Sequence, residues 1–392
     1  AGNTTGNARA LTRGSFESRE AYLEFAVPLA ADRPWARSLD LDLGARFVDF
    51  SNFGSDSVFE IGAGWRPTDT LSLRGAWSQA FRAPNVGELF GGRTQANPIV
   101  ADPCADFAGL SDVEILRCIA QGVPADGSFD QSGEETPELA GGNPALGPEH
   151  AELVTLGVSW RPAAWPDARL ALDFYDITID DGIGALGADA ILGQCLETGA
   201  EAFCGAIVRD ASGAIEFVEA QLQNLARETA RGIDATVEFS HDAAGGRLAH
   251  RLLASHVAER ELVAFPGADP LFGAGGYDPD TFGAIPEWRA RYALDWRSGP
   301  WSLGWQVHWI DAVKERGGEV FPGTVNRAGS VVYHDLTAGW SSREGLSLSL
   351  GVDNVTDVRP PFFANADEAN TDLATYRALG TTLWLRLDWR SD

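Results

Sequence analysis

Two groups of polar residues in this sequence could bind a ligand, and the first surrounds Arg82. Arg82 ends a predicted strand, and Asn85 and Glu88 follow it in the longest predicted loop, roughly 83–149. A guanidinium binds carboxylates and phosphates through paired hydrogen bonds, so Arg82 could meet such a group on a ligand. An arginine in this place more often holds its own loop, here through Glu88, while Pro84 and Asn85 shape the turn.

The second group is Gln306 and His308, near the outer end of another predicted strand. Residues two apart share one face of a strand, so both side chains should lie on the polar face and Trp309 on the other. This His could ligate iron or contact a sugar hydroxyl. A single His with no second ligand nearby is also what an ordinary polar strand face contains, so we predict no metal site there.

Four cysteines form two local pairs, Cys104 with Cys118 and Cys195 with Cys204, each in a Gly- and Asp-rich loop. Four cysteines allow three connectivities, and the short separations favour local pairing. We therefore expect two disulfides and an oxidising compartment. Zinc is the weaker alternative, because neither pair has the close spacing of a zinc knuckle.

Other chemistry finds little support. The acidic segment Asp278-Pro-Asp280 lacks the spacing and closing Glu of a calcium loop. The chain has no Gly-x-Ser-x-Gly, His-Glu-x-x-His or phosphate-binding loop, and neighbouring His334 and Asp335 should point to opposite faces of a strand. We expect neither an enzyme nor a cofactor.

The charge balance excludes another class. A formal net charge of −26 argues against a nucleic-acid partner, because phosphate binding needs clustered Lys and Arg. The acidity fits large soluble loops, or alternatively a surface for cations or calcium-bridged lipopolysaccharide. No run approaches the roughly 18 uncharged apolar residues of a membrane-spanning helix.

The elements that would position these residues are strands of alternating polarity. Apolar residues recur at every second position in at least four segments, which places one face of each strand in an apolar medium. The apolar sets are Leu39, Leu41, Leu43, Ala45 and Phe47; Phe59, Ile61, Ala63 and Trp65; Leu346, Leu348, Leu350 and Val352; and Leu383, Leu385, Leu387 and Trp389.

The connections favour an outer-membrane barrel over a soluble sandwich. Short turns alternate with mostly long loops, which is typical of such barrels. The short turns are near 28–36, 67–70, 162–167, 241–246, 298–300 and 341–345, and the long loops are roughly 83–149, 181–218, 261–285, 313–329 and 354–378. An aromatic precedes most short turns and the chain end, which predicts a girdle at the membrane interface formed by Trp65, Trp160, Phe239, Trp296, Trp340 and Trp389.

With 219–240 counted as one long strand, the sequence predicts thirteen strands. An odd number cannot close as an all-antiparallel barrel, and single-chain bacterial barrels have even numbers. We therefore expect the chain to be incomplete at its amino end and not to insert stably alone, because unpaired strand edges are costly in lipid.

Four motifs carry a resemblance to a known family. They are Phe81-Arg82-Ala-Pro84 with Glu88-Leu-Phe90; Asn143-Pro-Ala-Leu-Gly-Pro-Glu149; Phe174-Tyr-Asp-Ile-Thr-Ile-Asp-Asp-Gly-Ile183; and Gly351-Val-Asp-Asn-Val-Thr-Asp357. In this order, across most of the chain, they resemble segments of TonB-dependent outer-membrane receptors.

The resemblance implies a 22-stranded transmembrane antiparallel β-barrel, of which residues 1–392 would be the last thirteen strands. An amino-terminal plug domain, a TonB box and about nine strands would be missing. Its partners would be outer-membrane lipid and lipopolysaccharide, the TonB energy-transducing complex acting through the plug, and a nutrient. The family usually ends on an aromatic residue, whereas here Arg390, Ser391 and Asp392 follow Trp389.

The resemblance implies import of a scarce nutrient to the periplasm, bound at outer loops and lumen. Family members take ferric siderophores, cobalamin, haem, metal complexes or oligosaccharides. The aromatic and acidic composition slightly favours a sugar or a cationic complex over an anionic siderophore, for which lumenal Arg and Lys would be expected. Two alternatives stay open: a passive porin or adhesin-like barrel, and a soluble β-rich domain in which Leu39, Leu41, Leu43, Leu346, Leu348 and Leu350 would form a dry core.

Overall fold

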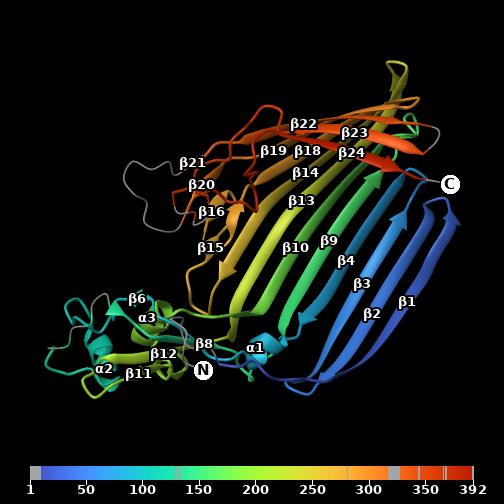
Figure 1. The fold of residues 1–392 in the computed structure, drawn as a ribbon. Coiled ribbons are helices and arrows are strands. Elements are labelled where there is room, and N and C mark those ends of the chain that lie inside the picture. The colour runs from blue at the N-terminus through green and yellow to red at the C-terminus, as the bar shows by residue number, and fades with distance from the viewer. Residues whose placement is uncertain are drawn as a thin grey trace.

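The computed structural model describes residues 10–390, apart from 128, 130, 132–133, 280, 317–326, 343–344, 365 and 367–368. Within this part of the chain, thirteen antiparallel strands form one large curved sheet (Figure 1), as the alternation predicts. In sheet order they are β1 (Ser18–Arg33), β2 (Ala36–Phe50), β3 (Gly54–Arg66), β4 (Leu71–Arg82), β9 (Glu149–Trp160), β10 (Arg169–Gly184), β13 (Gln223–Ala243), β14 (Gly246–Val263), β18 (Trp288–Ser298), β19 (Trp301–Ile310), β22 (Val331–Ser341), β23 (Leu346–Asp353) and β24 (Thr382–Trp389).

The apolar face of this sheet is open. Leu348, Leu350 and Leu385 are 40%, 51% and 69% exposed, and the three clusters of buried apolar residues found in the described chain lie chiefly among the loops and outer strand ends. These leucines therefore do not form a dry core, and the alternative of a soluble β-rich domain, which requires one, is wrong. No helix among the described residues is long and apolar enough to cross a membrane.

As predicted, short turns alternate with mostly long loops, but the bounds of some strands and turns differ from the prediction. The strand expected over 219–240 is two elements, because β12 (Ile215–Gln221) pairs in parallel with β8 (Glu138–Gly141) in a separate small sheet. The first turn is also shorter than expected. β1 continues past Pro28 through a register shift, and a strand tolerates proline at such an irregularity because the ladder of hydrogen bonds is interrupted there.

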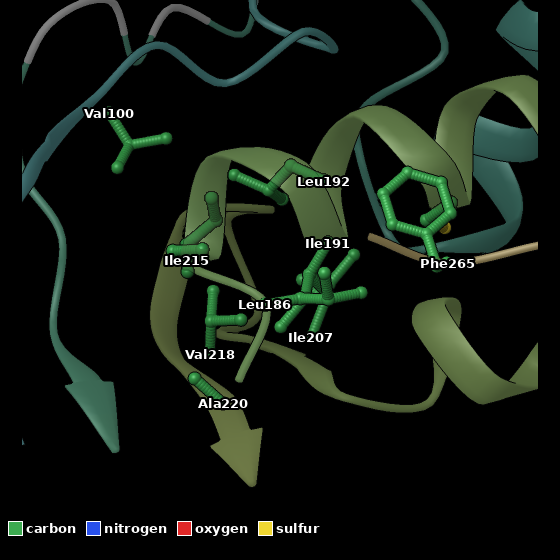
Figure 2. Close-up of a cluster of buried hydrophobic side chains, with 11 residues drawn as sticks. Val100, Leu186, Ile191, Leu192, Ile207, Ile215, Val218, Ala220 and Phe265 are labelled. Atoms are coloured by element: carbon green, nitrogen blue, oxygen red, sulfur yellow. The ribbon is translucent and has the colours of Figure 1, made fainter. Parts of the chain in front are cut away.

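Two of the long loops fold together into an outer subdomain, defined here as residues 94–141 and 186–221, which the sequence does not predict. It contains helices α2 (Asp112–Ala120), α3 (Ala188–Thr198) and α4 (Glu201–Cys204), and strands β5 (Thr94–Ala96), β6 (Ile99–Val100), β7 (Glu134–Glu135), β8, β11 (Ile207–Arg209) and β12. Figure 2 shows its core, where Ile191 and Leu192 of α3 lie near Ile215 and Val218 of β12. Both expected disulfides, Cys104–Cys118 and Cys195–Cys204, are present there.

A second set of loops packs near the outer ends of β19 and β22. It contains β15 (Leu271–Phe272), β16 (Gly276–Asp278), β17 (Gly283–Ile285), β20 (Val313–Glu315) and β21 (Arg327–Ala328). Its buried cluster joins Tyr277, Tyr333, Phe363 and Tyr376. Tyr277 comes from the connection between β14 and β18, Tyr333 from β22, and the other two from the connection between β23 and β24. The loop 354–381 is thereby fixed against the wall of the sheet.

Candidate ligand-binding site

Arg82, Asn85 and Glu88 form one network at the outer end of β4. The Arg82 guanidinium donates to both Glu88 carboxylate oxygens at 3.0 Å and to Glu149 Oε1 at 2.8 Å. Asn85 caps the short helix α1 (Val86–Phe90), where its Oδ1 accepts from the Glu88 N–H at 3.0 Å and its own N–H donates to Glu88 Oε2 at 2.8 Å. These contacts agree with the interpretation in which Arg82 holds its own loop.

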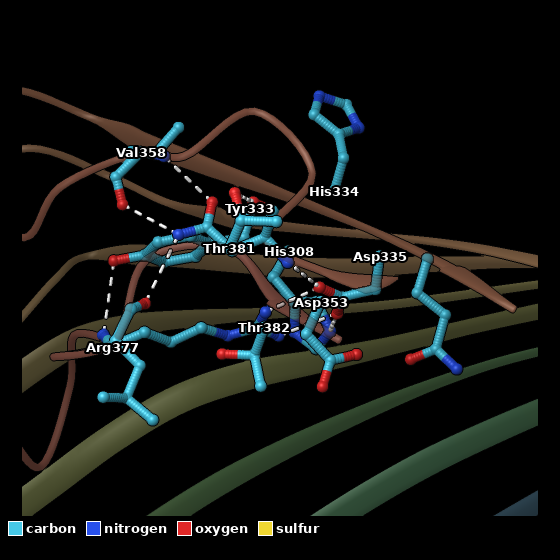
Figure 3. A network of polar contacts seen from close by, with 12 residues as sticks. His308, Tyr333, His334, Asp335, Asp353, Val358, Arg377, Thr381 and Thr382 are labelled. Atoms are coloured by element: carbon cyan, nitrogen blue, oxygen red, sulfur yellow. Dashed lines mark hydrogen bonds and ion pairs between the residues drawn. The ribbon is translucent and has the colours of Figure 1, made fainter. Parts of the chain in front are cut away.

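Gln306 and His308 lie on the polar face of β19, as the alternation predicts, and they have neighbours that the sequence does not reveal. Gln306 Oε1 accepts a hydrogen bond from Arg291, and His308 Nε2 lies 3.4 Å from Asp335 Oδ2. His334, next to Asp335, points to the other face (Figure 3), where its Nδ1 accepts from the Trp305 indole N–H at 3.3 Å. In the described residues no group of three or more His, Cys, Asp or Glu is arranged to hold a metal, and Asp280 lies outside them.

A pocket of about 450 Å³ opens beside His308 on this polar face. Its charged lining consists of Arg289, Arg291 and Arg377 together with Asp234, and Ser255 and Thr375 add hydroxyls. The Ser255 hydroxyl donates to Asp234 Oδ1 at 2.5 Å. The lining carries three guanidiniums and one carboxylate, and Asp335 behind it pairs with Arg377. The pocket still has an excess of positive charge, in contrast to the acidity of the whole chain.

Asp335 is the centre of the contacts behind this pocket (Figure 3). Its two carboxylate oxygens accept from the Arg377 guanidinium at 2.6 and 2.8 Å, and Oδ1 also accepts from the Asn354 backbone N–H at 2.8 Å. Asn354 is 1% exposed, and its side chain accepts from the Val358 N–H and donates to the carbonyls of Val358 and Leu379. One strand carboxylate therefore fixes both ends of the loop 354–381.

Burial and ion pairing shift the pKa values of two side chains in this loop, Arg377 and Tyr376. The hydrogen bonds and charge of Asp335 raise the pKa of Arg377 above its ordinary value. Burial raises the pKa of Tyr376 to about 12, because the phenolate would lose its hydration inside the aromatic cluster. The Tyr376 hydroxyl is buried, and in the described chain it has no hydrogen-bond partner.

Several arginines lie together on the polar face, although the chain as a whole is strongly acidic. Going toward the short turns, β14 and β18 place further arginines on the same face as Arg289 and Arg291: Arg251, Arg247 and Arg297. Arg251 pairs with Glu238, and Arg247 with Asp167 at 2.8 Å. The slight preference for a sugar or cationic ligand assumed that this face lacks arginine, and that assumption is wrong.

A second pocket, also of about 450 Å³, lies along this row of arginines and shares Leu253 and Arg291 with the first. Its polar lining includes Glu238, Arg251, Asp295 and Gln306. The two pockets together trace a polar path along β13, β14, β18 and β19 from the outer loops toward the short turns.

The predicted girdle residues occupy the short-turn ends of six strands. Trp65, Trp160, Phe239 and Trp389 are 37%, 47%, 41% and 72% exposed on the apolar face, and Trp296 and Trp340 are half-buried beside neighbouring strands. Their positions agree with the spacing argument, and their contact with lipid stays a prediction.

An open apolar face, a polar face with pockets, short turns at one end and long loops at the other define an outer-membrane β-barrel wall. A family model described as TonB dependent receptor-like, beta-barrel, matches residues 1–355. The chain belongs to the TonB-dependent receptor β-barrel family, whose members are outer-membrane proteins.

Solved structures support the same fold at low sequence identity. The siderophore receptor PirA from Acinetobacter baumannii is 16% identical, with a TM-score of 0.63 over 97% of this chain and 47% of its own. A mutant of the ferric enterobactin receptor PfeA from Pseudomonas aeruginosa is 17% identical, with a TM-score of 0.62 over 95% of this chain and 45% of its own. The FrpB iron transporter from Neisseria meningitidis is 12% identical, with a TM-score of 0.56 over 95% and 44%.

The chain thus spans less than half the length of these solved structures. No curated protein sequence matches it.

Proposed function

We propose that this chain is the carboxy-terminal part of the barrel of an active outer-membrane transporter, which binds a scarce nutrient at its outer loops and lumen and imports it with energy from TonB. The observation that carries the proposal is the family membership over residues 1–355, together with a polar face that bears two adjoining pockets. The polar face would be the lumenal wall, and the apolar face would meet outer-membrane lipid and lipopolysaccharide.

The remaining strands and a plug domain would be supplied by sequence outside these 392 residues. Two features support this part of the proposal. The sheet order runs from β1 at one edge to β24 at the other, and the solved structures that share the fold are more than twice as long. TonB would act on the plug, so this chain would contribute binding and the wall of the path.

The ligand class rests on the chemistry of the pocket beside His308. Arg289, Arg291 and Arg377 favour a nutrient complex that carries anionic groups, because guanidiniums bind carboxylates and similar oxyanions through paired hydrogen bonds. The names of the similar solved structures include a siderophore receptor and a ferric enterobactin receptor. An iron chelate is therefore the first ligand to test, ahead of cobalamin or an oligosaccharide.

The test separates active import from passive diffusion. The intact receptor is expressed in a Gram-negative host without its own enterobactin receptor, and binding and uptake of radioactive ferric enterobactin, cobalamin and a labelled oligosaccharide are measured with and without a protonophore. We expect one ligand to bind in both conditions and to enter only in energised cells. Uptake that continues unchanged after the protonophore would identify the alternative, a passive porin.

A further inference from the structure

The loop 354–381 is attached to the wall by an ion pair that also borders a pocket. Arg377 and Thr375 of this loop line the pocket beside His308, and Arg377 at the same time holds Asp335 of β22 through two hydrogen bonds. The Asp335 side chain is 9% exposed, whereas the Arg377 side chain is 33% exposed. The guanidinium is therefore open to the pocket on one side and engaged with a buried carboxylate on the other.

The pocket offers two more guanidiniums at this place. Arg289 donates to the Ala284 carbonyl at 3.1 Å and to the Thr375 hydroxyl at 3.2 Å, and Arg291 donates to Gln306. A guanidinium has five N–H donors, so these bonds leave further donors on each side chain. A ligand oxyanion that entered the pocket would meet three arginines and would compete with Asp335 for Arg377.

We propose that Arg377 is an exchangeable latch: a carboxylate or phosphate group in the pocket takes the Arg377 guanidinium from Asp335, and the loop segment 377–379 becomes more mobile while the aromatic cluster keeps the rest of the loop in place. The proposal rests on the proposed function only in treating this pocket as part of the ligand path.

The contacts around Asp335 make such an exchange feasible. After Arg377 leaves, Asp335 keeps the Asn354 N–H, and the His308 imidazole lies 3.4 Å away, so the buried carboxylate is not left without partners. The Arg377 guanidinium also lies over the Tyr333 ring, with Cζ 5.0 Å from the ring centroid. The Tyr333 hydroxyl accepts a hydrogen bond from the Arg377 backbone N–H at 3.3 Å. This bond does not involve the side chain, so the guanidinium can turn away from Asp335 while the bond is kept.

The test uses substitutions whose predicted effects have opposite sign. Binding of inorganic phosphate, malonate and the neutral sugar maltotriose to the intact receptor in detergent is measured by calorimetry. Asp335→Asn removes the competing charge but keeps an oxygen for the Asn354 N–H, so the oxyanions should bind about tenfold more tightly. Arg377→Gln should weaken their binding by about tenfold or more. The control Asp388→Asn breaks the exposed pair with Arg386 on β24 and should change nothing.

A merely structural ion pair predicts something else, namely that Asp335→Asn and Arg377→Gln both weaken binding, and that result would overturn the latch. Equal binding of maltotriose, or no binding of either oxyanion, would overturn it as well. Tighter binding of phosphate than of malonate assigns a phosphate group, and the reverse order assigns a carboxylate. These outcomes are independent of whether uptake needs a protonmotive force, so failure of the latch and failure of the transporter proposal can be told apart.

A second measurement does not depend on the folding of the Asn variant. A nitroxide label is placed at Leu379→Cys, a position 71% exposed in the loop, and its mobility is recorded by electron paramagnetic resonance. Phosphate or malonate should increase the mobility in otherwise native protein. Arg377→Lys, which cannot form the paired bonds, should give high mobility without any anion. A spectrum that neither the anions nor Arg377→Lys changes would contradict the latch.

Discussion

Asp102→Ala should open the outer subdomain and leave the barrel wall intact. Asp102 of the first long loop pairs with Arg209 of the second, and their side chains are 0% and 3% exposed. Arg209 also donates to the Gly213 carbonyl at 2.9 Å, and Asp102 accepts the Cys104 N–H at 2.9 Å. The substitution therefore leaves a guanidinium buried without its counterion and removes the acceptor of one backbone N–H.

The expected magnitude follows from this burial. Removing one partner of a buried ion pair costs about 3–5 kcal/mol, and the cost appears as easier local opening up to the stability of the subdomain itself. Hydrogen exchange of α2, α3 and β12 in the intact receptor should accelerate by about a hundredfold or more. Exchange in β10 and β13 should be unchanged, because the pair touches only the outer subdomain.

Two controls sharpen the result. Asp173→Ala breaks an exposed pair with Arg74, and such pairs contribute about 0–1 kcal/mol, so exchange should hardly change. The double variant Asp102→Ala with Arg209→Met removes the stranded charge and should recover much of the protection. If Asp102→Ala has no more effect than Asp173→Ala, the reasoning from burial is refuted.

Three further outcomes are expected. Cys104→Ser with Cys118→Ser should lower the stability of the outer subdomain by about 3 kcal/mol and increase its proteolysis, with no change in the heat-modifiable migration of the barrel. Tyr376→Phe should leave stability unchanged or raise it, because the buried hydroxyl has no hydrogen-bond partner among the described residues, and it should remove one tyrosine from the ultraviolet titration near pH 12. In the unsubstituted protein the pKa of Tyr376 is raised from 10.0 to about 12 by folding, so its contribution to stability should be constant below pH 10 and fall as the pH rises from 10 to 12. Leu350→Arg on the apolar face should destabilise the barrel by about 2–4 kcal/mol in denaturant unfolding from lipid vesicles, whereas Ser349→Arg on the polar face should cost much less.

Most of the wall could be predicted from the sequence because strand alternation is a local property. The apolar positions of β2, β3, β23 and β24 follow from period two alone, and so does the placement of Gln306 and His308 on one face with His334 and Asp335 on opposite faces. Pairing of the cysteines followed from their short separations. The family motifs added the order of the segments.

The outer subdomain and the latch could not be predicted because they depend on contacts between distant loops. Asp102 and Arg209 are 107 residues apart, and Asp335 and Arg377 are 42 apart. No periodicity marks a loop residue such as Arg377, and the parallel pairing of β8 with β12 divided a segment that looked like one long strand. For Asp335 the sequence does give an indication, because the alternation of its strand places the side chain on the polar face. That strand, β22, pairs with β19, which carries His308.

The most direct test of the central claim asks which face of the sheet meets water in the outer membrane. Gln306→Cys and Val307→Cys are neighbours on β19 with side chains on opposite faces, and they are treated in intact cells with a membrane-impermeant thiol reagent. The account predicts that the cysteine at 306 reacts from the aqueous lumen and that the one at 307, facing lipid, does not. Reaction at 307 with none at 306 would contradict the assignment of the polar face as the lumenal wall.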